Sequence, residues 1–406
     1  MSGIPQPNSE GTEAVRPKDS TRHRNITMER PLDSNRRSSF LILPFLCFFY
    51  FYVFDELEKA QTSMNQKPLF DTMPCTPDRR MPDQWCMDVS GTPRYLGIPS
   101  FNNPTVQRYN HQGFEKCLAN KTIVFIGDSR VRYQFLHLAA FLKRKRFMKC
   151  QDYDIYTNPV HNSSTLDDDC YLIDQIHNAN MKKNDWKSFY EESTKLTESE
   201  HTESNSQQYS LCDCFRSEPF IPTTTYENRF IKRKTAYGEV NLIYLQTFVN
   251  LVRINIEFPP FSSFWSEQRC KPGECSASSR TDAFTGDIGN ALWLLPRLNA
   301  THSFVSLGWG DLSHTDDISC AIKDFEHHHP EIAVYLISHP RRRSDSSSPS
   351  VFFDEDKLEC EVKSLDRTRM SKDVPLEWYW DDLHLLSIMN EEFNHQLIEN
   401  ICPIMR

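Results

Sequence analysis

The pattern of hydrophobic and polar positions in this chain is most informative between residues 122 and 142. The β-type run 122–126 stops abruptly at Gly127-Asp128-Ser129, and apolar residues then recur with helical spacing. One face of the helical segment would carry Val131, Phe135, Leu138, Ala139 and Leu142. This pattern predicts a strand, a sharp turn and a helix, with a serine at the carboxyl end of the strand.

Later apolar runs predict further strands. Residues 240–248, 302–307 and 332–338 are short runs of the kind that form buried strands. Helical patterns cover residues 287–298 and 386–398. Apolar strands that alternate with helical patterns indicate an α/β fold, and we expect a mostly parallel central sheet flanked by helices. Active sites in such sheets lie beyond the carboxyl ends of the strands.

The remaining segments have less periodicity. Residues 75–117 carry Pro, Gly and Asn, and they predict an irregular, disulfide-tied lobe that opens a domain spanning residues 75–406. Residues 178–210 are polar and predict a long surface loop. Residues 1–39 are polar with mixed charge, which predicts a disordered tail, and residues 55–74 are expected to form a short stem.

Residues 40–54 form an uncharged apolar run, shorter than the roughly 20 residues of a typical membrane-spanning helix. Arg36 and Arg37 precede the run. We expect a signal anchor, with a cleaved signal peptide or a buried core helix as the alternatives. The positive-inside rule then places residues 1–39 in the cytosol and the domain in the lumen. The protein would be a single-pass type II protein of the Golgi or endoplasmic reticulum membrane.

Cysteine usage agrees with a lumenal domain. One of the thirteen cysteines, Cys47, lies in the apolar run, and an even number follows it. An even set behind an anchor predicts disulfides formed in an oxidising compartment. The set consists of Cys75, Cys86, Cys117, Cys150, Cys170, Cys212, Cys214, Cys270, Cys275, Cys320, Cys360 and Cys402. Glycan acceptor patterns begin at Asn120, Asn162 and Asn299.

Charge and spacing exclude some classes of partner. The formal net charge is −9, and no basic patch with interleaved aromatic residues occurs, so we expect no nucleic-acid partner. The trio His327-His328-His329 and the pair Cys212-x-Cys214 lack the spacing of metal sites. We expect no bound metal, and interpret them as a solvated loop and a disulfide region.

Ser129 has the placement of a nucleophile. The N–H groups at the start of a helix can stabilise an oxyanion, and a histidine that removes its proton activates a serine. His384, in the pattern Asp381-x-x-His384, is the candidate base, and Asp381 would hold its other ring nitrogen. The alternatives are a Ser129 that only caps the helix, a structural His384, and Asp382 as the orienting carboxylate.

The Gly127-Asp128-Ser129 turn and the Asp381-x-x-His384 pair resemble the motifs of the SGNH/GDSL hydrolase superfamily, and more narrowly those of its PC-esterase branch. That branch includes the plant trichome-birefringence-like polysaccharide O-acetyltransferases and the lumenal domain of sialate O-acetyltransferases. The resemblance implies an SGNH-like fold and a catalytic triad of Ser129, His384 and Asp381. The two motifs lie near the two ends of the region after residue 75, and only a few residues in that region match the family pattern.

Other candidates surround this motif pair. SGNH enzymes place oxyanion donors, often a glycine N–H and an asparagine, on a loop such as the one at Gly308, which here has no asparagine. The oxyanion candidates are therefore the N–H groups of Ser129 and Gly308, with the Arg130 cation as a third. A solvated arginine is the alternative for Arg130. Candidates for an apolar wall that contacts a sugar or excludes water are Trp309, Trp378 and Trp380, with core packing as the alternative for Trp378 and Trp380.

These features together predict a lumenal carbohydrate O-acyltransferase, specifically an O-acetyltransferase, with an acyl-serine intermediate. One alternative is an O-acetyl esterase acting on glycans, which differs only in its final acceptor. The other is a non-catalytic glycan-binding protein with the same fold. We expect no tightly bound cofactor and an acyl donor derived from acetyl-CoA as co-substrate. If the acyl carrier has to cross a membrane, a separate membrane protein would supply it.

Overall fold

The computed structural model describes most of the chain between residues 69 and 403. The described ranges are 69–76, 84–89, 93–96, 105–147, 186–197, 209–216, 221, 225–248, 251–255, 283–306, 315–342, 358–372, 374–379 and 383–403. The expected tail and membrane anchor lie outside these ranges, and the last residues of the expected stem belong to a strand. Among the described helices, none has the length and apolarity that a membrane crossing requires.

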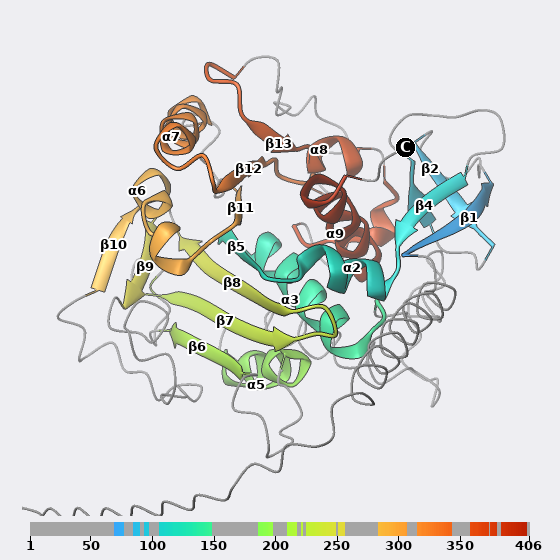
Figure 1. Cartoon of the computed structure of the whole chain (residues 1–406), viewed down its shortest axis with the longest axis horizontal. Coiled ribbons are helices and arrows are strands. Elements are labelled where there is room, and N and C mark those ends of the chain that lie inside the picture. Colours follow the sequence, from blue (N-terminus) through green and yellow to red (C-terminus); the bar gives the residue numbers. More distant parts are fainter. Residues whose placement is uncertain are drawn as a thin grey trace, which may run out of the picture. The chain divides into compact units, whose positions relative to one another are not determined.

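A nine-stranded sheet forms the centre of the described structure (Figure 1). Five neighbouring strands are parallel, in the order β8 (Glu239–Phe248), β5 (Lys121–Gly127), β11 (His302–Ser306), β12 (Ala333–Ile337) and β13 (Lys363–Leu365). Antiparallel strands complete the sheet on the β8 side: β6 (Tyr209–Phe215), β7 (Tyr226–Lys234), β9 (Leu251–Asn255) and β10 (Ala283–Asp287). The strands predicted at 240–248, 302–307 and 332–338 are confirmed.

The α/β class is confirmed, but the sheet is mixed rather than mostly parallel. A short turn joins β7 to β8, and in it Thr235 N donates to Gly238 O at 2.8 Å. Gly238 has a φ of 150°, a conformation that a side chain disfavours. So short a connection returns the chain antiparallel, whereas parallel neighbours such as β11 and β12 need a crossover through a helix.

The alternation of side chains along β5 divides the core into two layers. Ile123 and Phe125 pack in the cluster that includes α2 (His111–Leu118), α3 (Ser129–Arg144) and α9 (Ser387–Ile401). Val124 and Ile126 point to the opposite face, where α6 (Ile288–Leu292) and α7 (Thr315–His328) pack. A strand that is apolar on both faces is therefore buried by helices on both, as the period of two requires.

Two predictions of local structure were wrong. The segment 178–210 is not all loop, because α5 (Trp186–Thr197) packs Phe189 and Leu196 into the core beside α3. These two apolar residues are seven positions apart, a helical spacing that the polar residues between them obscure. The helix predicted at 287–298 stops after α6 and is followed by a 3-10 turn, η2 (Pro296–Leu298), because proline cannot continue an α-helix.

The segment expected as an irregular lobe contains a second sheet. Its antiparallel strands have the order β3-β2-β1-β4: β1 (Phe70–Thr76), β2 (Trp85–Asp88), β3 (Pro93–Tyr95) and β4 (Thr105–Tyr109). A disulfide joins Cys75 on β1 to Cys86 on β2, with Cα atoms 5.5 Å apart. The predicted disulfide in this lobe is therefore present. The described part of the lobe forms a regular antiparallel sheet rather than the irregular structure that the sequence predicts. The strands β2 and β3, of four and three residues, are too short to show alternation in the sequence.

All eight cysteines in the described ranges are paired. The other three pairs are Cys117–Cys402, Cys212–Cys214 and Cys320–Cys360. The first joins α2 to the end of α9 across 285 residues of sequence. Cross-links over such long loops restrict the unfolded chain strongly. The remaining four cysteines of the expected set, Cys150, Cys170, Cys270 and Cys275, lie outside the described residues.

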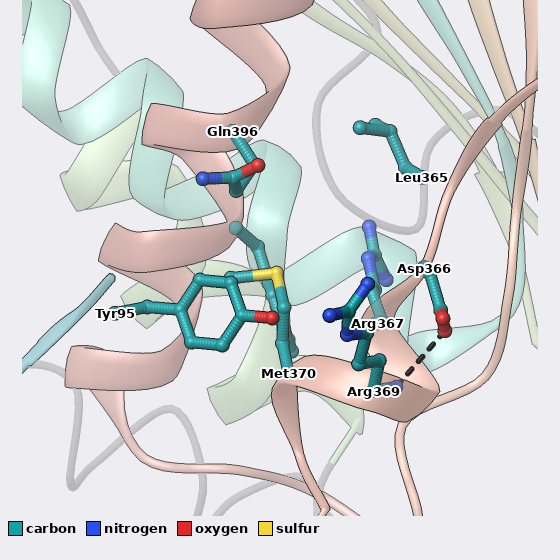
Figure 2. Close-up of a pocket in the computed structure, with 8 residues that line it drawn as sticks. Tyr95, Leu365, Asp366, Arg367, Arg369, Met370 and Gln396 are labelled. Atoms are coloured by element: carbon teal, nitrogen blue, oxygen red, sulfur yellow. Dashed lines mark hydrogen bonds between the residues drawn. The ribbon is translucent and has the colours of Figure 1, made fainter. Parts of the chain in front are cut away.

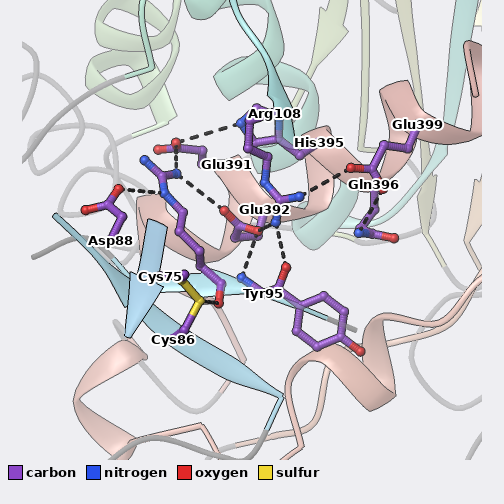
Figure 3. A network of polar contacts seen from close by, with 11 residues as sticks. Cys75, Cys86, Asp88, Tyr95, Arg108, Glu391, Glu392, His395, Gln396 and Glu399 are labelled. Atoms are coloured by element: carbon purple, nitrogen blue, oxygen red, sulfur yellow. Dashed lines mark hydrogen bonds and ion pairs between the residues drawn. A yellow bond between two sulfur atoms is a disulfide. The ribbon is translucent and has the colours of Figure 1, made fainter. Parts of the chain in front are cut away.

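A buried ion-pair network attaches the small sheet to α9 (Figure 3). The fully buried carboxylate of Glu392 accepts hydrogen bonds from Arg108 Nη2 at 2.6 Å and from the Tyr95 backbone N–H at 3.1 Å. Arg94 Nη1 lies 3.4 Å from the same carboxylate, and its Nε donates to Asp88 at 3.0 Å. Because every charge in this network has a partner of opposite sign, the network can be buried without isolated ions.

A second buried group makes stability depend on pH. His137 on α3 is only 4% exposed, and its burial lowers its pKa to about 3. The unfolded chain binds a proton at this histidine below about pH 6.5, while the folded chain does not, so acid favours unfolding. We expect His137 alone to lower the free energy of unfolding by about 2 kcal/mol between pH 7 and pH 5.

The measurement is chemical denaturation of the wild type and His137→Gln over that pH range. His137→Gln should be less stable at pH 7 but should lose less stability on acidification than the wild type. His327→Gln, at an exposed position, is the matched control. A His137→Gln variant with the full wild-type pH dependence would show that another group is responsible.

Candidate active site

Ser129 lies where the sequence predicts it. It is the first residue of α3, directly beyond the carboxyl end of β5, and it is half-buried. Asp128 caps the helix: its side chain accepts a hydrogen bond from Arg130 N at 3.0 Å. The first N–H groups of a helix have no acceptor within the helix. The cap occupies the N–H of Arg130.

Gly127 is required by packing rather than by backbone conformation. A Cβ atom at this position would lie 2.6 Å from Val131 Cγ2 and 3.1 Å from Ser306 Cβ. The first atom is in the first turn of α3 and the second is on the neighbouring strand β11. The absence of a side chain therefore lets α3 start immediately after β5. This close approach fixes where the Ser129 side chain emerges.

Asp128 and Arg130 form a buried charge pair next to the serine. The Arg130 Nε donates to Asp128 Oδ2 at 2.9 Å. Burial alone would raise the pKa of Asp128, but the charges of Arg130 and His339, with the hydrogen bonds from Arg130, outweigh it and hold this pKa well below its usual range. Asp128 is therefore ionised, and Arg130 neutralises a carboxylate that would otherwise oppose an oxyanion nearby.

His384 comes to Ser129 from 255 positions away in the sequence. Its Nε2 lies 2.7 Å from Ser129 Oγ, a hydrogen-bond distance. The histidine is 8% exposed. With the ring proton on Nδ1, Nε2 accepts the hydroxyl proton of the serine. The predicted pairing of nucleophile and base is therefore present in the geometry of the site.

His384 is not part of a helix. After η6 (Leu376–Trp378), Tyr379 and Leu385 form an antiparallel bridge, and Leu386 N donates to Trp378 O at 2.8 Å. His384 lies just before α9. Asp381 and Asp382, the two candidates for orienting it, lie outside the described residues.

Tyr133 holds the other side of the histidine. It follows Ser129 by one helical turn, so both side chains lie on the same face of α3. The edge of one ring faces the other, with centroids 5.1 Å apart and an interplanar angle of 78° between Tyr133 and His384. Tyr133 is 3% exposed, so it restricts both the imidazole ring and the access of water to it.

Several residues at this edge of the sheet were not predicted. The Tyr244 hydroxyl on β8 lies 3.1 Å from the carbonyl oxygens of Gly127 and Asp128, which fixes the turn. His339, just beyond β12, lies 3.3 Å from Arg130 Nη2 through its Nε2 and 3.4 Å from Ser306 Oγ through its Nδ1. The signal that could have found Ser306 and His339 is their position at the carboxyl ends of predicted strands.

The other predicted site residues have mixed outcomes. Trp378 is fully buried and packs edge-on against Trp85, with ring centroids 5.0 Å apart. It is therefore a core residue rather than a substrate wall. Arg130 is 8% exposed and is held by Asp128. Three further candidates, Gly308, Trp309 and Trp380, lie outside the described residues.

The described residues contain no group of three or more His, Cys, Asp or Glu side chains that could hold a metal ion. In the histidine trio after Glu326, His328 Nδ1 lies 2.9 Å from Asp324 O and His329 Nδ1 lies 3.2 Å from Glu331. These histidines contact different partners near the end of α7 and do not converge.

The arrangement around Ser129 is suited to acyl transfer. A hydroxyl at a helix N-terminus is hydrogen-bonded to an imidazole nitrogen, and the acidic neighbour is neutralised. Comparison with family models, with curated proteins and with solved structures gives no match to this chain.

Gly127→Ala tests whether the close approach of α3 to β5 builds the site. Since Val131 and Ser306 would have to move, we expect a loss of about 1–3 kcal/mol in the free energy of unfolding. The matched control is Gly289→Ala on α6, where the new Cβ would lie at an ordinary 3.5 Å from Ala321 Cβ. There we expect no loss or a gain of about 0.5–1 kcal/mol. Equal stability of the two variants in urea titrations would contradict the packing argument.

Proposed function

We propose that this protein is a serine-dependent acyl-transfer enzyme that acts on carbohydrate, and specifically an O-acetyltransferase. The single observation that carries the proposal is the 2.7 Å contact between Ser129 Oγ and His384 Nε2. Two residues singled out by their motifs meet with the geometry that a nucleophile and its base require. The same contact disfavours a purely glycan-binding protein, which has no need of it.

In the first half-reaction, Ser129 Oγ attacks the carbonyl carbon of the acyl donor while its proton passes to His384 Nε2. The N–H of Ser129, and of Gly308 if its loop is placed as the resemblance implies, would bind the oxyanion. The bond to the leaving group then breaks, and the leaving group takes the proton from His384. The product is an acyl-serine.

In the second half-reaction, a sugar hydroxyl loses its proton to His384 Nε2 and attacks the acyl carbon. The Ser129 oxygen leaves and recovers a proton from His384. Water in place of the sugar gives an esterase, so the residues at the serine suit either outcome. The resemblance to glycan-modifying PC-esterases with an SGNH-like fold favours the transferase, with an O-acetyl esterase as the close alternative.

The proposal includes a compartment. A single span at residues 40–54 would hold the enzyme in the Golgi or endoplasmic reticulum membrane with its catalytic domain in the lumen. The four cysteine pairs support an oxidising environment. A donor derived from acetyl-CoA would then have to be delivered across the membrane by a separate protein.

Ser129→Ala and His384→Ala test the reaction. Each should lower the rate of acetyl transfer or release from p-nitrophenyl acetate by at least about 10³-fold, because the pair acts as a unit, and the double variant should be little worse. Wild-type protein quenched during turnover should carry an acetyl group on the peptide that contains Ser129, as detected by mass spectrometry.

Ser319→Ala is the matched control, since the Ser319 hydroxyl donates only to Asp316 O, at 2.9 Å, on the opposite layer. It should retain wild-type turnover, and melting curves should show that all variants are folded. A folded Ser129→Ala protein with unchanged turnover would end the catalytic proposal.

Asp381→Asn and Asp382→Asn, compared in the same assay, assign the carboxylate that orients His384. We expect the larger loss for Asp381→Asn, because that residue matches the motif, and a mild effect for Asp382→Asn. The reverse order would reassign the orienting role to Asp382.

A further inference from the structure

A pocket of about 200 Å³ lies between the small sheet, α8 (Arg367–Met370) and α9 (Figure 2). It is smaller than the roughly 300–1,000 Å³ of sites for drug-sized ligands, so it suits one small ring or a single charged group. Its apolar lining includes Tyr95, Met370 and Phe393. Its charged lining consists of Asp366, Arg367 and Arg369.

Arg367 is the unusual residue of this pocket. Its side chain is only 2% exposed, yet its buried Nε and Nη2 donate to no residue in the described part of the chain. Its guanidinium lies over the ring of Phe393, 4.9 Å from the centroid. Burial lowers the pKa of Arg367 to about 9, which still leaves it cationic at neutral pH. A buried cation without a hydrogen-bonded anion is costly.

The nearby acidic groups do not satisfy this cation. Asp128 attracts Arg367, but the Asp128 carboxylate is hydrogen-bonded to Arg130, whose own charge repels Arg367. Asp366 Oδ1 accepts hydrogen bonds from the Arg369 backbone N–H at 2.9 Å and from Ser338 Oγ at 3.2 Å. The Asp366 carboxylate therefore serves as the cap of α8, and no hydrogen bond joins it to the Arg367 guanidinium.

Arg369 adds a second positive charge at the pocket. Arg369 is exposed. Burial raises the pKa of Tyr95, and the positive charge of Arg369 opposes that rise. Figure 2 shows both guanidinium groups between the Tyr95 ring and Asp366. Two cations and one carboxylate leave the lining with a net positive charge. Planar guanidinium groups suit carboxylate and phosphate oxygens, and the Tyr95 ring offers a face to a ring-shaped ligand.

We propose that this pocket binds the carboxylate or phosphate group of a small anionic sugar, with Arg367 as its main ligand and Arg369 at its mouth. The anion would supply the hydrogen-bond acceptor that Arg367 lacks among the described residues. The lining of the pocket includes neither Ser129 nor His384, and its occupancy does not depend on the acyl-transfer proposal. A binding measurement therefore tests it without any assay of activity.

The experiment uses the purified full-length chain and three probes that share one ring: glucose, glucuronate and glucose 6-phosphate. Calorimetric titration and thermal melting should show saturable binding, with a rise in Tm, for the anionic sugars and not for glucose. Binding of glucuronate alone would identify a carboxylate site, and binding of glucose 6-phosphate alone a phosphate site. Inorganic phosphate that binds as tightly as glucose 6-phosphate would overturn the contribution of the ring.

Arg367→Met should lower the affinity for the anionic sugar by at least about tenfold. Without ligand, it should melt at the same temperature as the wild type or higher, because it removes an unpartnered buried charge. Arg369→Gln, at an exposed position, should fold normally and lose affinity by a smaller factor. Arg297→Gln, which removes an exposed arginine from η2, is the charge-matched control and should bind as the wild type does.

Two results would overturn the proposal. The first is that none of the anionic probes binds to the wild type. The second is that Arg367→Met and Arg369→Gln both bind as the wild type does, which would place the site elsewhere. If Arg367→Met does not fold, Arg369→Gln against Arg297→Gln decides the question alone.

Discussion

The ion pairs of the buried Glu392 carboxylate join the two parts of the structure that position His384. Glu392 lies on α9, and the arginines that hold it, Arg94 and Arg108, belong to the amino-terminal sheet. Trp378 packs on Trp85 of that sheet, just before the loop that carries His384. The amino-terminal sheet thus fixes both ends of the segment around the histidine. These contacts therefore help to set the position of His384 relative to Ser129 on α3.

Buried charged side chains are paired with opposite charges in some parts of the structure and are left without such a partner at Arg367, among the described residues. Around Glu392, and between Asp128 and Arg130, each buried charge has a partner, so the folded state bears little electrostatic cost. Arg367 is the exception, since its buried guanidinium lacks such a partner among the described residues. A buried charge without a partner is costly, and the proposed anion would supply that partner.

Acyl transfer needs a site in which a developing negative charge is stabilised before the reaction begins. Here the helix N-terminus provides oriented N–H groups, and Arg130 neutralises the carboxylate of Asp128. Tyr244 holds the backbone of the turn, and Tyr133 holds the imidazole. Preorganisation therefore comes from four elements, β5, β8, α3 and the loop before α9. The proposed nucleophile, Ser129, is a single residue on α3.

The sequence by itself determined the local elements whose pattern is strong. The strand–turn–helix around Ser129, the strands β8, β11 and β12, and the helix α9 follow from apolar periodicity, and the motif pair singled out Ser129 and His384. Only the tertiary structure decided which segments are neighbours. Tyr244 and Arg367 have no local signal, and Ser306 and His339 have only their position at the carboxyl ends of predicted strands. The contacts of these residues are with residues that are distant in the sequence. The sequence made Trp378 a candidate for a substrate wall, but in the structure it is buried against Trp85. The periodicity of a segment shows which of its faces is buried. It does not show which other segment covers that face, because the covering segment is distant in the sequence.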